Sequence, residues 1–158
     1  MKINPKKILW PTDFSEVSLK AGDYVRGYCN TFDAEVHLVH VCAPLPNPDM
    51  LPAGVELTVS DKGVVDTFLE AARTRLQRVA VEHLGGVSPV VCDVLGGHPW
   101  SEVCEYAKRA GTDLIILSTH GLTGLRHLLI GSTAERVVQH APCPVLVIKG
   151  VERDHTME

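Results

Sequence analysis

Short runs of apolar residues, separated by glycine, proline and polar residues, predict β-strands along the chain. The run "DLIILS" has no alternation of apolar and polar positions, which is typical of a parallel strand covered on both faces. The run "EVHLVHVC" ends at "APLPNPDMLPAG", where four prolines and a glycine exclude regular structure. The expected strands are Lys7–Pro11, Glu35–Cys42, Val87–Leu95, Asp113–Ser118 and Pro144–Lys149.

Between these runs, apolar residues recur every three or four positions, the spacing of helices with one buried face. Ser15 offers a hydroxyl N-cap to the first helix and Ser132 to the last, while Pro99 and Gly111 suit the start and end of a helix over Pro99–Ala110. The expected buried positions are Val17, Ala21, Tyr24, Val25, Tyr28 and Cys29 in the first helix, Val65, Phe68, Leu69, Ala72, Leu76, Val79 and Ala80 in a helix over Asp61–Leu84, and Ala134, Val137 and Val138 in Thr133–His140.

Strands that alternate with helices predict an α/β fold, a three-layer sandwich with helices on both faces of a five-stranded parallel sheet. The order 3-2-1-4-5 places strands one and four side by side, so that the loops after them diverge around one crevice. We expect a single domain over residues 1–150 and a C-terminal tail over residues 151–158.

The composition and charge of the chain argue against nucleic-acid binding and against insertion into a membrane. Hydrophobic residues make up 45% and charged residues 22% of the 158 residues, which is ordinary for a globular protein. The net charge of -4 favours neither DNA nor RNA as a partner. No apolar run approaches the roughly 20 residues of a membrane span, and the start does not resemble a targeting peptide, so we expect a cytoplasmic protein with no membrane partner. The five cysteines are scattered singly, which favours reduced core cysteines.

The stretch that begins "STHG" follows the fourth strand and is suited to phosphate. Gly121 is followed by nine residues and then by Gly131 and Ser132, at the expected start of a helix. Glycine lets the backbone approach an anion closely, and N–H groups and a hydroxyl at a helix start donate hydrogen bonds to it. Alternatively, the glycines serve tight turns and Ser132 is only an N-cap.

The loops after strands one and two supply other candidate contacts at the same edge of the sheet. The carboxylate of Asp13, in "PTDFS", can accept a hydrogen bond from a ribose hydroxyl or an adenine amine, or else it helps to cap the first helix. Val41 can line an adenine pocket or belong to the core. In the glycine-containing loop, His120, Arg126 and His127 can meet phosphate charge or remain solvated.

Several other chemistries lack their motifs. His37 and His40 are three apart on a strand, so they point to opposite faces and do not share a metal. There is no H-E-x-x-H and no cluster of cysteines and histidines, so we expect no metal site made of protein ligands. A serine-hydrolase elbow, G-x-S-x-G, is missing, and so are the two common phosphate loops, G-x-x-x-x-G-K-[ST] and G-x-G-x-x-G. Any nucleotide is therefore held by a different kind of loop.

Four stretches together resemble the universal stress protein family: "ILWPTDFS", "HLVHV", "GGHPWSEVCEYAKRAGTDLIILSTHG" and "LRHLLIGSTAERVVQHAPCPVLVIK". The resemblance implies a fold of the adenine nucleotide alpha hydrolase type. The family's ATP-binding pattern is glycine, two residues, glycine, nine residues, then glycine with serine or threonine. Here Ser118 occupies the position of the first glycine. Serine is strained there if the position needs a left-handed φ, and harmless if the φ is ordinary.

The resemblance also implies ATP as the ligand, Mg²⁺ held through its phosphates, and a homodimer formed through the strand Pro144–Lys149. As an edge strand, this segment would present unpaired backbone groups to a second copy. The implied nucleotide contacts are Pro11, Thr12 and Asp13 at the adenosine end, Val41 at the adenine, and Ser118, His120, Gly121, Gly131, Ser132 and Thr133 at the ribose and phosphates.

These features predict a homodimeric ATP-binding module for stress response or signalling. Catalysis needs a base and a positioned water, and the candidate bases are only Asp13 or a loop histidine, so we expect slow ATP hydrolysis at most. The alternative within the same family is a dimeric interaction protein that binds no nucleotide. An enzyme that adenylylates a substrate ranks last, because the loop after the first strand contains no glycine.

Overall fold

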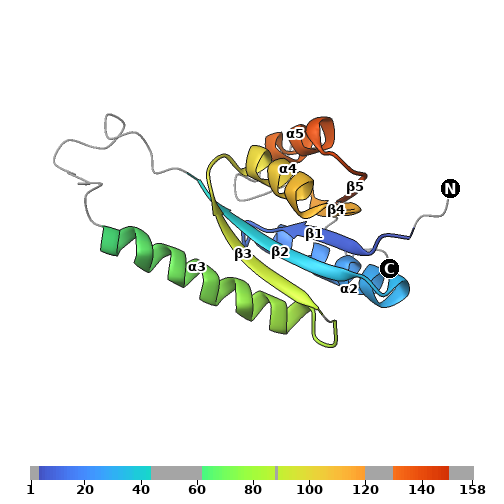
Figure 1. The fold of residues 1–158 in the computed structure, drawn as a ribbon, viewed down its shortest axis with the longest axis horizontal. Coiled ribbons are helices and arrows are strands. Elements are labelled where there is room, and N and C mark those ends of the chain that lie inside the picture. The colour runs from blue at the N-terminus through green and yellow to red at the C-terminus, as the bar shows by residue number, and fades with distance from the viewer. Residues whose placement is uncertain (1–3, 44–61, 88, 120–129, 150–158) are drawn as a thin grey trace, which may run out of the picture.

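The computed structural model describes residues 4–43, 62–87, 89–119 and 130–149. Within them, five strands form one parallel sheet in the order β3-β2-β1-β4-β5 (Figure 1). The fold class and the strand order predicted from the sequence are thus confirmed. The strands are β1 (Lys7–Pro11), β2 (Glu35–Cys42), β3 (Val90–Gly96), β4 (Leu114–Ser118) and β5 (Val145–Ile148).

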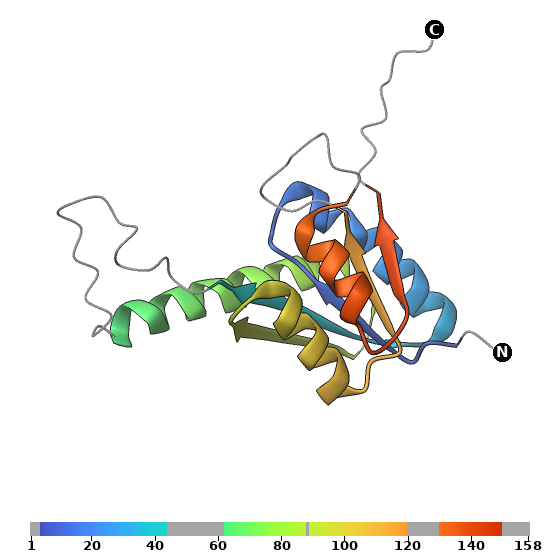
Figure 2. The ribbon, with the colours of Figure 1, turned by 90° about the horizontal axis from the view of Figure 1, so that it is seen from above.

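Helices cover both faces of the sheet. Helices α2 and α3 pack on one face, and α4 and α5 pack on the other (Figures 1 and 2). None of the helices in the described part of the chain combines the length and the apolar character needed to span a bilayer. The helices are α1 (Glu16–Leu19), α2 (Ala21–Phe32), α3 (Lys62–His83), α4 (Pro99–Ala110) and α5 (Ser132–His140).

Alternate residues of each strand supply two separate cores. Trp10 of β1 belongs to the core beneath α2 and α3, whereas its neighbour Leu9 belongs to the core beneath α4 and α5. The same alternation separates Ile116 from Ile115 in β4. Because successive side chains of a strand point to opposite faces, an uninterrupted apolar run can fill both cores.

Three helix predictions need correction. The first predicted helix is divided at Lys20 into α1 and α2, and Tyr24, expected to be buried, is 52% exposed. In α3, Val65 and Phe68 are exposed, the latter at 67%, because the N-terminal part of this helix projects beyond the sheet (Figure 2). In α5, Val138 is also exposed. Helical spacing identifies the apolar face but does not show how much of it a neighbour covers.

Strand β3 begins at Val90, later than the predicted start at Val87. The backbone N–H of Val87 donates to the carbonyl of Leu84 at 2.9 Å, which closes a turn after α3. Gly86 lies in this turn with a φ of +86°, a conformation that favours glycine. The apolar Val87 therefore belongs to the turn and not to the sheet.

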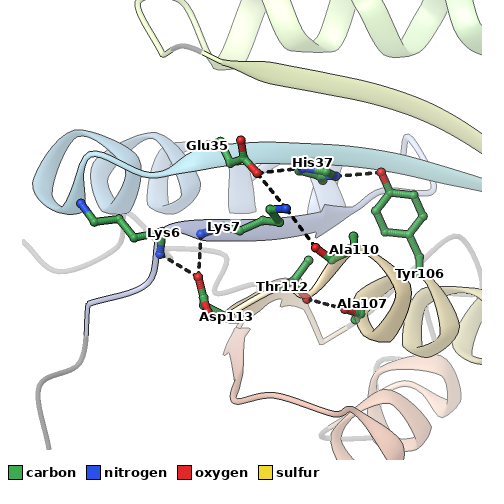
Figure 3. A network of polar contacts seen from close by, with 9 residues as sticks. All are labelled: Lys6, Lys7, Glu35, His37, Tyr106, Ala107, Ala110, Thr112 and Asp113. Atoms are coloured by element: carbon green, nitrogen blue, oxygen red, sulfur yellow. Dashed lines mark hydrogen bonds and ion pairs between the residues drawn. The ribbon is translucent and has the colours of Figure 1, made fainter.

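A polar network ties the amino ends of the strands together, at the edge opposite the predicted site (Figure 3). The Lys7 ammonium contacts Glu35 Oε1 at 3.0 Å and donates to the carbonyl of Ala110 at 2.9 Å. His37 lies between Glu35 and the hydroxyl of Tyr106, with Nδ1 2.8 Å from that hydroxyl oxygen. The network links β1, β2 and α4, and it places His37 on the face opposite His40, as the sequence predicts.

Replacing Glu35 with glutamine should lower the free energy of unfolding by less than about 1 kcal/mol at neutral pH, because the ion pair is partly exposed. The hydrogen bond from Lys7 lowers the pKa of the Glu35 carboxyl. A lowered folded pKa stabilises the fold above the unfolded pKa, and this contribution is lost as the pH falls through the folded pKa. The unfolding free energies of the two proteins in urea should therefore differ near neutral pH, and the difference should shrink as the pH falls through the lowered folded pKa of Glu35. Glu105→Gln, on the exposed side of α4, is the control, and a difference that does not vary with pH would contradict the prediction.

Candidate functional site

A cavity of about 490 Å³ lies at the carboxyl ends of β1, β2 and β4, bordered by the start of α4 and the first turns of α5. This is the point where the sheet's winding reverses, between β1 and β4. The cavity brings together residues from five separate parts of the sequence. The predicted site residues that line it are Pro11, Thr12, Asp13, Val41, Ser118, Gly131, Ser132 and Thr133. Two more, His120 and Gly121, lie outside the described residues, as do Arg126 and His127.

Thr12 anchors the loop that follows β1. Its backbone N–H donates to the carbonyl of Val39 at 2.9 Å, and its hydroxyl accepts the N–H of Phe14 at 3.0 Å. The same hydroxyl lies 2.8 Å from Ser18 Oγ, which donates to the carbonyl of Ser15. Thr12 therefore donates its hydroxyl proton to Ser18. This buried side chain shapes the edge of the cavity through contacts within the loop.

Asp13 lines the cavity and also supports the start of the first helix. Its Oδ1 accepts the backbone N–H of Ser15 at 2.9 Å, and Ser15 Oγ in turn accepts the N–H of Ser18 at 3.2 Å. Ser15 is the N-cap of α1, as predicted. The alternative role proposed for Asp13 is thus present in the structure, and it holds the carboxylate at the rim of the cavity.

The end of β2 forms a wall of the cavity through consecutive residues. Val41 packs against the core beneath α4 and α5, so it is both a core residue and a cavity residue. His40 also borders the cavity, and its Nδ1 lies 2.8 Å from the carbonyl oxygen of Thr12. Because a carbonyl only accepts, the ring carries its proton on Nδ1. Sequence reasoning missed His40 as a site residue, although its place beside Val41 at the carboxyl end of a strand was an available signal.

Ser118 sits in β4 with ordinary backbone geometry. It lies in register with Ile148 of β5, and the non-glycine residues with positive φ in the described part of the chain are Phe14 and Asp33. A left-handed φ at this position would have strained a serine. The backbone therefore accommodates serine where the family's ATP-binding pattern has glycine.

Gly131, and not Ser132, is the N-cap of α5. Gly131 has φ -71° and ψ 156°, and Ser132 is the first helical residue. The first hydrogen bond of the helix runs from the N–H of Glu135 to the carbonyl of Gly131. The backbone N–H groups of Ser132, Thr133 and Ala134 therefore have no acceptor within the helix, and all three residues border the cavity. The start of a helix with such groups attracts negative charge.

Backbone hydrogen bonds hold this helix start in place. The N–H of Thr119, directly after β4, donates to the carbonyl of Ile148 in β5 at 3.0 Å. The carbonyl of Thr119 accepts the N–H of Gly131. The first turn of α5 is thereby connected to the ends of both β4 and β5.

Neither thiol chemistry nor a protein-ligated metal is favoured in the described part of the chain. Burial raises the pKa of Cys29 to about 11, and burial also raises the pKa of the thiols of Cys42, Cys92, Cys104 and Cys143. A thiol with a raised pKa is protonated at neutral pH and is a weak nucleophile. Among the described residues, no three histidine, cysteine or acidic side chains are grouped so that they could hold a metal ion.

Comparison with known proteins decides the family. Residues 4–149 match the universal stress protein family. The chain belongs to this family. Universal stress protein MJ0531 of Methanocaldococcus jannaschii is 36% identical over 149 residues, which cover 94% of this chain and 85% of the relative.

Solved structures of family members have the same architecture. Hypothetical protein MJ0577, also from M. jannaschii, matches with a TM-score of 0.78 at 31% identity, covering 91% of this chain and 95% of that one. A universal stress protein family member from Arabidopsis thaliana, At3g01520, was solved with AMP bound. It matches with a TM-score of 0.56 at 22% identity over 95% of both chains, a likeness that shows the fold alone.

Proposed function

We propose that this protein binds ATP in the cavity at the carboxyl edge of the sheet and acts as a cytoplasmic stress-response or signalling module. The proposal rests on one observation: a carboxylate beside an apolar residue and the N-terminus of a helix border the same cavity. Asp13 and Val41 border it on the side of β1 and β2. The first turn of α5, whose N-cap Gly131 has no side chain to cap the helix, borders it beside β4. A hydrogen-bond acceptor near an apolar surface suits a nucleoside, and unbonded helix N–H groups suit phosphates.

The residues that border the cavity fit a nucleoside triphosphate whose phosphates are bound mainly by backbone N–H groups. The N–H groups of Ser132, Thr133 and Ala134, with the adjacent hydroxyls, would contact the phosphates. Val41 would contact the adenine, and Asp13 the ribose. Any Mg²⁺ would be bound through the phosphates and water, because Mg²⁺ usually keeps several waters and is bound through substrate phosphates.

Binding, and not rapid turnover, suits this set of residues. Hydrolysis requires a base that orients the attacking water. Asp13 is a candidate base among the described cavity residues, and its Oδ1 already accepts the N–H of Ser15. We therefore propose a module with slow hydrolysis at most, whose output depends on whether nucleotide is bound.

Isothermal titration of the purified protein with ATP and Mg²⁺ tests the proposal, and AMP serves as a second titrant because a protein of the same fold was solved with AMP. Heat that saturates with ATP supports the proposal, and tighter binding of ATP than of AMP supports the role of the α5 N-terminus. No heat with either nucleotide at millimolar concentration would instead favour a family member that binds no nucleotide.

We also propose that the protein forms a homodimer through β5, which pairs with β4 alone among the described strands. The carbonyl of Pro144 accepts the N–H of Ile115 in β4, and the carbonyl of Ile148 accepts the N–H of Thr119 directly after β4. In a parallel ladder the backbone of Val147 therefore points away from β4. Val147→Pro removes an outward N–H without breaking the β4–β5 ladder. Sedimentation at micromolar concentration should show a dimer for the wild type and for Val147→Thr, and a monomer for Val147→Pro. A monomeric wild type would contradict the proposal.

A further inference from the structure

The ring of Phe14 contacts two other side chains beside the proposed nucleotide site. Its ring is buried and lies 4.3 Å, centroid to centroid, from the imidazole of His40 in β2. The guanidinium carbon of Arg75, in α3, lies 4.5 Å from the centroid of the same ring. We refer to Arg75, Phe14 and His40 as the stack. It joins three segments that are far apart in the sequence.

The stack holds a backbone conformation that is otherwise unfavourable. Phe14 has a φ of +64°, in the left-handed region that residues with a Cβ rarely adopt. Such a conformation persists only when the surrounding structure enforces it, and it often occurs at functional sites. The contacts of the Phe14 ring with His40 and Arg75, together with the bond from its N–H to Thr12 Oγ1, enforce it here.

Hydrogen bonds connect the stack to the backbone on either side of Asp13, at the edge of the cavity. The Nδ1–H of His40 donates to the carbonyl of Thr12 at 2.8 Å, directly before Asp13, and the N–H of Phe14 directly follows Asp13. Both peptide units that flank Asp13 are therefore fixed by members of the stack or by Thr12. The direction of the Asp13 carboxylate at the cavity rim depends on these two peptide units.

We propose that His40, Phe14 and Arg75 are positioning residues that orient Thr12 and Asp13 for the nucleotide and couple α3 to occupancy of the site, an inference that rests on the ATP site proposed above. These side chains act through the backbone around Asp13. Coupling between two parts of a protein is reciprocal, so a stack that supports nucleotide binding is itself stabilised by the nucleotide.

Substitutions of His40 separate the hydrogen bond from the ring contact. His40→Asn keeps an N–H donor near the position of Nδ1 and loses the ring, whereas His40→Phe keeps a ring against Phe14 and loses the donor. A hydrogen bond contributes roughly 1 kcal/mol, so His40→Phe should weaken ATP binding about fivefold or more. His40→Asn should recover most of this loss. A purely structural role would change thermal stability in both variants without this recovery of affinity.

A substitution of Arg75 is a second test of the proposed role of the stack. Arg75 is exposed, so replacing it should not prevent folding. Arg75→Met keeps the long apolar stem and removes the charge over the Phe14 ring, and Arg78→Met is the matched control on the same helix. A cation–π contact at an exposed site contributes roughly 0.5–1 kcal/mol, so Arg75→Met should weaken ATP binding about twofold to fivefold. Arg78→Met should bind like the wild type.

Hydrogen exchange of the wild type and of Arg75→Met tests the coupling between α3 and the nucleotide site. ATP should slow amide exchange in α3 around Arg75, and Arg75→Met should reduce this slowing. The inference is overturned if the wild type binds ATP while His40→Phe and Arg75→Met bind equally well, or if ATP leaves exchange in α3 unchanged. A wild type that binds no ATP would overturn the proposed function itself, and this result is visible before any variant is made.

Discussion

Replacing Gly131 with valine should abolish detectable ATP binding while leaving the fold intact. Gly131 has φ -71° and ψ 156°, an extended conformation that valine adopts readily, so the substitution does not strain the backbone. The added isopropyl group would occupy space at the first turn of α5, where the phosphates are expected. Each hydrogen bond to a charged group contributes about 1.5–3 kcal/mol, so losing several of them should weaken binding at least about 100-fold. Titration calorimetry with ATP and Mg²⁺ measures this loss.

The matched control is Gly27→Val, in α2 and away from the cavity. A Cβ at Gly27 would meet no atom within 4 Å, so the side chain projects into open space. This variant should bind ATP like the wild type. Binding by Gly131→Val with unchanged affinity would mean that the nucleotide does not approach the start of α5, and the proposed phosphate site would then be wrong.

Replacing Gly22 with alanine should destabilise the fold by about 2 kcal/mol, the middle of the range for overpacking a core. A Cβ at this position would lie 2.7 Å from Cη2 of the Trp10 indole and 3.0 Å from Cβ of His83. Trp10 is fully buried in the core beneath α2 and α3, where a displaced indole would have to move other packed side chains. Gly22 is therefore required by the close approach of α2 to β1 and to the end of α3.

Gly27→Ala in the same helix isolates this packing effect. It meets no neighbour and replaces a flexible helical residue, so it should stabilise the protein by roughly 0.5–1 kcal/mol. Urea unfolding of the wild type and both variants gives the comparison. If Gly22→Ala were as stable as Gly27→Ala, the contact between Gly22 and Trp10 would not limit the packing of α2.

The strands could be predicted from the sequence because each follows from a local signal. Apolar runs located the strands, and their alternation with helices indicated a parallel sheet, whereas the order that places β1 beside β4 was assumed and is confirmed by the structure. That placement brings "PTDFS" and the start of α5 to one cavity. Ser15 was correctly predicted as an N-cap because a hydroxyl at a helix start has a local hydrogen-bonding role.

Features that depend on contacts between distant segments could not be predicted. Phe68 has the spacing of a buried residue, but its exposure depends on where the sheet ends relative to α3. The contact of Arg75 with Phe14 depends on the positive φ of Phe14 and on the position of α3 along the loop after β1. Neither feature can be recognised from the spacing of apolar residues in the sequence. Ser132 was a reasonable N-cap by residue type, yet the helix begins one residue earlier than its hydroxyl would require.

The connection of α5 to β5 through Thr119 gives the sheet edge a mechanical link to the cavity. Two successive peptide hydrogen bonds, from Thr119 to Ile148 and from Gly131 to Thr119, span the whole path from the edge strand to the helix start. Such a short path of backbone groups contains no side-chain rotamer that could absorb a displacement. We therefore expect a shift of β5 to displace the N–H groups at the start of α5, and an anion bound to those groups would resist the same shift.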